Sequence, residues 1–121
     1  MNQLIMNTTR ENLDDGIEMD DSCTDHNVVS MNLVTKNVHD GIEVVDSDFN
    51  NIVLNEVTFN GISKSKDSGI ELKLASGESG ASRNFVDSND IHDNSDMLVN
   101  LLNCKQTDGK NTGNNVPPKC Q

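Results

Sequence analysis

The sequence predicts an all-β protein: a right-handed single-stranded parallel β-helix (solenoid) of about four coils of ~25 residues, followed by a flexible C-terminal tail. Three observations predict this fold. The chain matches itself when it is shifted by 25 residues, a Gly-Ile-Glu-apolar motif recurs, and a triplet of asparagines recurs with it.

The first two repeats are the most similar to one another. Residues 2–22 and 27–47 carry the same residue at ten of 21 aligned positions. The identical pairs are Asn2/Asn27, Met6/Met31, Asn7/Asn32, Asn12/Asn37, Asp15/Asp40, Gly16/Gly41, Ile17/Ile42, Glu18/Glu43, Asp21/Asp46 and Ser22/Ser47. Such self-similarity at a fixed period is typical of repeat architectures.

Two further coils follow, with changes in length. The motif recurs at residues 16–19, 41–44 and 69–72, and the asparagine triplets are Asn2/Asn7/Asn12, Asn27/Asn32/Asn37, Asn51/Asn55/Asn60 and Asn84/Asn89/Asn94. Two residues after the first asparagine come Leu4, Val29, Val53 and Val86, and two after the second come Thr9, Val34, Val57 and Ile91. The extra residues at 61–66 and 76–81 are predicted to be surface loops.

Physical chemistry connects this pattern with stacked coils. Short β-branched stretches with alternating apolar positions predict strands with one buried face. Asparagine at a corner tolerates the left-handed backbone of a sharp bend, and we expect the glycine before Ile-Glu to do the same. Equivalent residues of stacked coils lie about 4.8 Å apart, which allows apolar columns and asparagine ladders. We therefore expect Ile42 to be buried between Ile17 and Ile70.

The pattern also predicts the domain limits. Residues 1–104 are expected to form the repeats and residues 105–121 a flexible tail. Asn2 already lies on the first asparagine column, so the first coil begins without a cap, which predicts a fragment of a longer solenoid or an oligomer. The β-helix has three alternatives. A leucine-rich repeat is disfavoured because its Leu-x-x-Leu-x-Leu frame does not recur, and a pentapeptide-repeat helix because Gly-Ile-Glu interrupts the five-residue step. An intrinsically disordered chain stays an alternative.

Composition limits the partners. The 121 residues form one domain at most, and the formal net charge of −11 disfavours nucleic acid and anionic membranes. We expect no membrane partner, because no apolar run approaches the ~20 residues of a span. Residues 1–6 do not resemble a signal peptide, which leaves the compartment open. Cys23, Cys104 and Cys120 form no CxxC motif; Cys104 and Cys120 pair or remain free thiols.

The strongest candidate site is an acidic column. Each Glu of the motif lies between two inward residues and should point outward, so that the glutamates of successive coils stack. Stacked like charges raise a carboxylate pKa or recruit a cation, and oxygen ligands suit Ca²⁺. The candidate Ca²⁺ ligands are Glu18, Glu43 and Glu71, flanked by Asp15, Asp40, Asp21 and Asp46. The alternative is a solvated acidic face that prevents edge pairing.

Other candidates are weaker. Asp14 and Asp15 suggest a carboxylate pair, but neighbours on a strand face opposite ways, which favours a corner. His39 is expected to stack over Asp14, where it is a candidate base, whereas His26 and His92 are expected at other corners without metal-ligand spacing. Cys23 has no histidine partner fixed by the sequence, so we predict no catalytic nucleophile.

The repeat, Asn…Asp-Gly-Ile-Glu-Val…Asp-Ser…Asn, resembles the parallel β-helix repeats of the pectate-lyase-like superfamily over residues 2–94. It is especially similar to β-helix regions of mannuronan C5-epimerases and periplasmic carbohydrate-binding proteins. The resemblance implies polysaccharide ligands, frequent Ca²⁺ and an extracellular or periplasmic location. The chain has no Tyr and no Asp-Pro-His, Gly-His-Gly or Arg-x-Lys motif, so no catalytic residue is transferred.

We therefore expect a scaffold or binding piece of a carbohydrate-active β-helix protein, with an acidic polysaccharide as ligand and no complete catalytic site. If it belongs to an enzyme, that enzyme is a polysaccharide lyase, epimerase or hydrolase. The alternative is a non-enzymatic surface or adhesin-type repeat protein.

Overall fold

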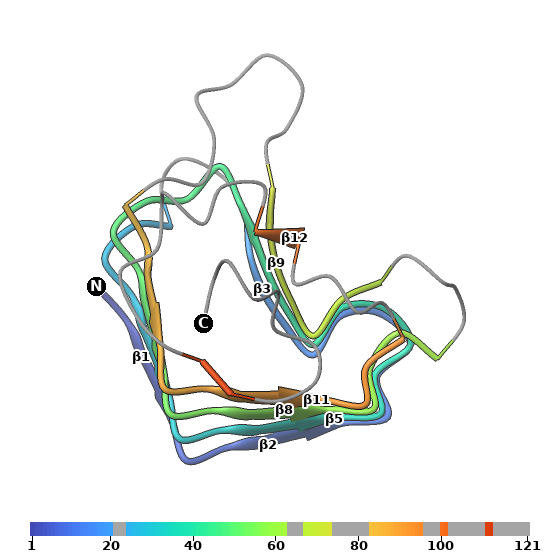
Figure 1. Ribbon diagram of the computed structural model, residues 1–121. Helices are drawn as coiled ribbons and strands as arrows, with labels where there is room; N and C mark the ends of the chain where they lie inside the picture. Colours follow the sequence, from blue (N-terminus) through green and yellow to red (C-terminus); the bar gives the residue numbers. More distant parts are fainter. Residues whose placement is uncertain (21–23, 63–66, 74–82, 96–99, 102–110, 113–121) are drawn as a thin grey trace.

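The computed structural model describes residues 1–20, 24–62, 67–73, 83–95, 100–101 and 111–112. This part of the chain is all-β, and its strands form three parallel sheets, as in a parallel β-solenoid (Figure 1). The all-β, parallel architecture predicted from the repeat is confirmed, whereas the right-handed winding and the number of coils stay predictions.

Each sheet takes one short strand from each successive coil. Sheet A contains β1 (Gln3–Ile5), β4 (Val28–Ser30), β7 (Asn51–Val53) and β10 (Phe85–Asp87). Sheet B contains β2 (Thr8–Arg10), β5 (Leu33–Thr35), β8 (Glu56–Thr58) and β11 (Asp90–His92). Sheet C contains β3 (Ile17–Met19), β6 (Ile42–Val45), β9 (Ile70–Lys73) and β12 (Asn100–Leu101). Successive coils overlay when the molecule is viewed along the stack (Figure 1).

Columns of inward side chains form the core. In sheet C, Ile42 pairs in register with Ile17 and Ile70 and is 0% exposed, which confirms the predicted burial. The other columns are Leu4/Val29/Ile52/Val86, Thr9/Val34/Val57/Ile91 and Met19/Val44/Leu72. Because each coil buries its small apolar set against the next coil, a chain with few hydrophobic residues still forms a continuous core.

The asparagine ladder lies in the described part as predicted, with one correction of register. The third coil contributes Asn50 rather than Asn51: Asn27 donates its N–H to Asn50 Oδ1 at 2.8 Å, whereas Asn51 is exposed in β7. Ile52, not Val53, is consequently the inward residue. The prediction failed because two asparagines are adjacent here; the constant five-residue spacing of the other triplets selects Asn50.

The corners also differ from the prediction, because the left-handed residue is the one before each asparagine. These residues have φ between 56° and 62°: Met6, Glu11, His26, Met31, Lys36, Phe49, Leu54, Phe59, Arg83, Ser88 and Asp93. The asparagine instead fixes the bend through its side chain, whose Oδ1 accepts hydrogen bonds from the preceding coil. At one corner the His26 and Phe49 rings stack 4.9 Å apart, and Arg83 lies 4.8 Å from the Phe49 centroid.

The motif glycines are required for space and not for a left-handed backbone. Among the described glycines only Gly61 has a positive φ, of 77°. A Cβ on Gly41 would lie 2.5 Å from the Gly69 carbonyl oxygen and 2.5 Å from Val57 Cγ1. The chain therefore passes so close to the next coil at this bend that no side chain fits.

Two residues of the predicted flexible tail stack on the last coil, and one of them, Asn111, joins the asparagine ladder. Asn111 Oδ1 accepts the backbone N–H of Asn89 at 3.1 Å, and Thr112 pairs in parallel with Asp90. Neither has a recognisable repeat around it, which is why the sequence placed them in the tail. The remaining residues of 105–121, like Cys23, Cys104 and Cys120, lie outside the described residues.

Candidate functional site

The predicted glutamate column lies on the outer face of sheet C. Glu18 pairs in register with Glu43, and Glu43 pairs with Glu71. Inward residues flank each glutamate along its strand, so the three side chains share the outer face. The stacking of these three carboxylates, which the sequence predicted, is confirmed.

Exposure in the column departs from the prediction of a solvated face. Glu18 is exposed, but Glu43 is only 5% exposed and the Glu71 side chain 14%. Glu43 is buried because a glutamate lies on either side of it and Lys73 contacts it. The acidic face is therefore open at Glu18 and closed further along the column.

Lys73 is the member of the candidate site that the sequence did not predict. Its Nζ donates a hydrogen bond to Glu43 and lies 3.4 Å from Glu71 Oε2. Lys73 is the second residue after Glu71 on the same strand, so the alternation of a strand places both on one face. That spacing was the signal that could have revealed it.

A second column precedes the motif glycines. Asp15 Oδ1 accepts the backbone N–H of Asp40 at 2.7 Å, and Asp40 Oδ1 accepts the backbone N–H of Ser68. Asp40 is 4% exposed. Each aspartate thus accepts a backbone N–H of the following coil, whereas the asparagine oxygens of the ladder accept from the preceding coil.

Burial dominates the electrostatics of the two columns. It raises the pKa of Asp40 to about 8, against the hydrogen bond from Ser68 and with the help of the carboxylates of Glu71 and Asp15. Burial also raises the pKa of Asp15 and of Glu43, and Lys73 opposes the rise at Glu43. The mutual repulsion predicted from the sequence contributes, but desolvation is the larger cause.

The pKa of Lys73 is also raised, but burial is not the cause. Burial alone would lower its pKa, but the hydrogen bond to Glu43 and the charges of Glu43 and Glu71 outweigh burial and raise it. The ammonium group therefore stays charged and neutralises part of the column.

Carboxylate oxygens of the two columns meet in two overlapping groups. Asp15, Glu18 and Glu43 offer oxygens within 4.8 Å of one another, and so do Asp40, Glu43 and Glu71. Five of the seven predicted ligands thus come together. Asp46 directly follows β6 and joins no such group among the described residues, and Asp21 lies outside them.

The predicted contact of His39 with Asp14 is present. His39 Nδ1 lies 2.9 Å from Asp14 Oδ1, with the His39 side chain 40% exposed and the Asp14 side chain 78% exposed. Ligand atoms of Asp14, Asp15 and His39 also lie within 4.8 Å of one another. The pair is therefore continuous with the acidic columns at the open end of the face.

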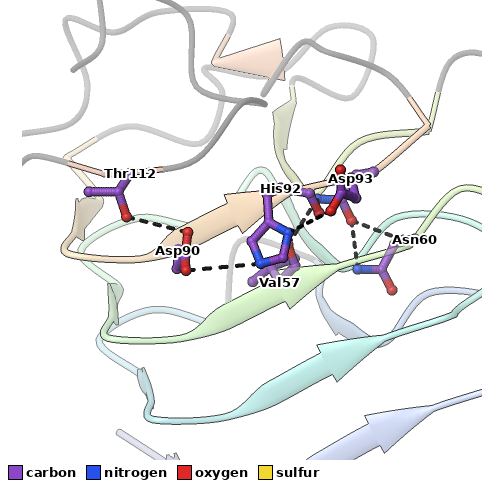
Figure 2. Close-up of polar contacts among 7 residues, drawn as sticks. Val57, Asn60, Asp90, His92, Asp93 and Thr112 are labelled. Carbon is purple, nitrogen blue, oxygen red and sulfur yellow. Dashed lines mark hydrogen bonds and ion pairs between the residues drawn. The ribbon is translucent and has the colours of Figure 1, made fainter.

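His92, at the end of β11, has acidic neighbours on two sides (Figure 2). Its Nδ1 lies 2.9 Å from Asp93 Oδ2 and its Nε2 3.9 Å from Asp90 Oδ2. The hydrogen bond with Asp93 raises the pKa of His92. Asp90 also accepts a hydrogen bond from the Thr112 hydroxyl at 3.4 Å, which connects this cluster with the fifth ladder position.

Asp40 should make stability depend on pH. Its folded pKa of about 8 lies above the ordinary 3.8, so its favourable contribution is complete below pH 3.8 and is lost as the pH rises through 8. The free energy of unfolding should fall by at most about 1.4 kcal/mol per pH unit between these two pKa values, and structural relaxation around Asp40 reduces this slope. Asp40→Asn keeps an oxygen for the Ser68 N–H and should raise the melting temperature at pH 8 while flattening the slope.

The matched control is Asp90→Asn, because the Asp90 side chain is 56% exposed. Thermal melts of both variants and the parent between pH 4 and pH 8 make the comparison. Parallel pH curves for Asp40→Asn and the parent would show that Asp40 is ionised throughout this range.

Comparison with protein-family models, curated proteins and solved structures gives no significant match. The described part of the chain also has no helix long and apolar enough to cross a membrane.

Proposed function

We propose that this chain is the binding part of a carbohydrate-active β-helix protein, and that the outer face of sheet C holds Ca²⁺ and, through it, an acidic polysaccharide. One observation carries the proposal: oxygens of Asp15, Glu18 and Glu43, from two coils, lie within 4.8 Å of one another. The resemblance of the repeat to the pectate-lyase-like superfamily supports the same ligand class. The proposal assigns no catalytic residue to this chain.

The donor chemistry fits Ca²⁺ better than softer metals. All three groups are carboxylates, and Ca²⁺ takes six to eight oxygen ligands in flexible geometry. Three carboxylates leave several positions for water or for the carboxylates of a sugar chain. Metals that prefer nitrogen or sulfur would find no such ligand in this group.

Lys73 determines which of the two carboxylate groups takes the ion. It bonds to Glu43 and lies beside Glu71, so its ammonium group already supplies positive charge to the Asp40–Glu43–Glu71 group. The Asp15–Glu18–Glu43 group lies toward the first coil, and Glu18 and Asp15 are accessible there. We therefore place the ion between Asp15 and Glu18.

The same charges explain why a cation is needed for the polysaccharide. The chain carries a formal charge of −11, and several of its carboxylates lie together on this face. A polyanionic sugar chain would be repelled by such a surface unless a divalent cation bridged the two. Binding of the sugar should therefore depend strictly on Ca²⁺.

Millimolar Ca²⁺ should raise the melting temperature, with a dissociation constant on the order of 10⁻⁴–10⁻³ M, as in extracellular modules. Glu18→Gln should remove most of the rise. Glu56→Gln, which changes an exposed glutamate on sheet B in the same way, should keep it. Glu43→Gln should also remove it, but that variant loses the contact with Lys73 as well, so Glu18 is the cleaner test.

Calorimetric titration with an oligouronate, with and without Ca²⁺, then tests the sugar. We expect heat only when Ca²⁺ is present and only with an intact Glu18. A Ca²⁺ effect without sugar heat would leave a cation site and reject the polysaccharide.

A non-enzymatic structural repeat is the second candidate, and the contacts of Lys73 favour it. The ammonium group of Lys73 neutralises part of the negative charge of Glu43 and Glu71. A face with this internal neutralisation does not need a bound cation. On this alternative, Ca²⁺ leaves the melting temperature unchanged and the oligouronate gives no heat.

A further inference from the structure

We infer that Asn60 is a modification site that the asparagine ladder keeps latent, and that its deamidation prevents the third coil from closing again once it has opened. The sequence contains a single Asn-Gly pair, Asn60-Gly61. Glycine has no Cβ, so it leaves its backbone nitrogen open to the side chain of the preceding residue. The proposed Ca²⁺ ligands take no part in this inference, which does not depend on the proposed function.

The reaction is a ring closure between neighbouring residues. The Gly61 nitrogen forms a bond to Asn60 Cγ and loses its proton, while the bond from Cγ to Nδ2 breaks and ammonia leaves with that proton. Water then opens the cyclic imide at one of its two carbonyl groups. The product is an aspartate, or an isoaspartate in which the main chain runs through the former side chain. Water is the only co-reactant.

The fold restrains the attacking nitrogen. The Gly61 N–H donates to the carbonyl oxygen of His39 at 2.7 Å and to that of Asn37 at 3.1 Å. Gly61 is also buried. Attack on Asn60 requires this N–H to leave both acceptors, so the nitrogen becomes reactive only when the second and third coils separate here.

The fold restrains the side-chain amide at both of its ends. Asn60 is 1% exposed, and its Oδ1 accepts the N–H of Asn37 at 3.1 Å and the Nδ2 of Asn37 at 2.8 Å. Its own Nδ2, which is the leaving group, donates to the Val34 carbonyl at 3.0 Å and to Asn94 Oδ1 at 2.9 Å. Ring closure would break these bonds in a place that solvent does not reach.

Both members of the reactive pair are required by the structure. The ladder needs the asparagine, and the bend after it needs the glycine, which has φ of 77°. A Cβ on Gly61 would lie 2.7 Å from Ser95 Cβ and 2.8 Å from the Asp67 carbonyl oxygen. The susceptible sequence is therefore built into this corner of the third coil.

The product does not fit the ladder. Aspartate at position 60 has an oxygen in place of Nδ2, and this oxygen would face Asn94 Oδ1 and the Val34 carbonyl oxygen. Asn94 cannot turn to offer a donor without a further loss, because its Nδ2 already donates to the Val57 carbonyl at 2.9 Å. A buried carboxylate against two oxygens is strongly unfavourable. Isoaspartate would in addition lengthen the main chain and shift the register of the coil.

The rate of deamidation tests the protection. The full chain is incubated at pH 7 with and without a denaturing concentration of urea, and the tryptic peptide 37–64 is sequenced by mass spectrometry. We expect the mass gain of an amide-to-acid conversion at Asn60 to be about tenfold faster or more in urea, because the folded chain reacts only after opening. Asn55, in the same peptide but followed by glutamate, should remain an amide.

Gly61→Ala tests the identity of the nucleophile. In urea this variant should deamidate at Asn60 about tenfold more slowly or less, because the added Cβ hinders the approach of the backbone nitrogen. The comparison uses the unfolded chains only, so strain in the folded variant does not affect it. Equal rates in buffer and in urea, or no mass gain at Asn60 in urea, would overturn the inference.

Refolding tests the consequence. After removal of urea, chains with the acid at position 60 should fail to regain the melting transition of the parent. Asn60→Asp, which produces one of the two products directly, should lower the melting temperature by roughly 10 °C or more or abolish the transition. Asn51→Asp makes the same change at an exposed position and should melt close to the parent. Deamidated chains that refold with the melting temperature of the parent would contradict the inference.

Discussion

Replacing Ile42 with aspartate should unfold the protein. Ile42 is 0% exposed and lies between Ile17 and Ile70 in the central column of sheet C. A carboxylate there has no partner, and an unpaired buried charge costs several kcal/mol. The total stability of a domain is about 5–15 kcal/mol, so little would remain. We expect the far-UV β signal and the cooperative melting transition to be lost.

Ile62→Asp is the matched control, because Ile62 is 66% exposed. Its melting curve should stay close to that of the parent, since surface substitutions usually change stability by about 0.5 kcal/mol or less. A cooperative transition of unchanged midpoint in Ile42→Asp would contradict the register of sheet C.

Two adjacent asparagines should respond very differently to the same change. Asn50 is 0% exposed, and its Oδ1 accepts two hydrogen bonds from Asn27 while its own N–H and Nδ2 donate to Asn84. Asn50→Ala leaves the Asn27 N–H without its acceptor, at about 1–3 kcal/mol, and removes three further side-chain hydrogen bonds, to Asn27 Nδ2, Ser47 and Asn84. We expect a loss of roughly 3–5 kcal/mol of unfolding free energy on this basis.

Asn51→Ala provides the control within the same coil. Asn51 is exposed in β7, and its stability change should stay within about 0.5 kcal/mol. Urea unfolding of the two variants measures both values. The reverse order of the two effects would restore Asn51 to the ladder and shift the third coil by one residue.

The sequence predicted the parts of the fold that repetition encodes. A residue that recurs at each coil, such as Ile42 or Glu43, must share a column with its equivalents, because stacked coils allow no other arrangement. The adjacent asparagines 50 and 51 are equivalent in type, so the pattern alone could not choose between them. The five-residue spacing within the triplet identifies Asn50, whereas residue type alone does not.

The reasons for residue choice were less predictable than their positions. Both asparagine and glycine tolerate a left-handed backbone, and this property suggested their role at the bends. In the structure Met31 takes the left-handed conformation and Asn32 bonds to its neighbours in the ladder, while Gly41 is small because the next coil lies against it. Propensity describes one residue at a time, whereas these roles belong to contacts between coils.

The acidic residues of the candidate site could be predicted from the sequence, but the lysine that neutralises part of their charge could not. Glu18, Glu43 and Glu71 follow from the motif, but Lys73 occurs in one coil only and has no column of its own. Burial of Asp40 and Glu43 depends on what surrounds them in three dimensions. A repeat pattern contains no information about a contact that occurs once.

The corner positions of this fold accept side chains of very different chemistry. Since the neighbouring asparagine fixes each bend, the left-handed residue beside it can be as different as Glu11, Lys36 and Phe59, which follow one another along a single edge of the stack. Three such edges run the length of the molecule, each with a rise close to the ~4.8 Å of stacked strands. The contact of His26 with Phe49, at 4.9 Å between ring centroids, shows that neighbours on an edge are within stacking distance. Aromatic residues substituted at every corner of one edge would form a continuous π-stack. The fold can therefore serve as a scaffold that holds rings or charges at a regular spacing.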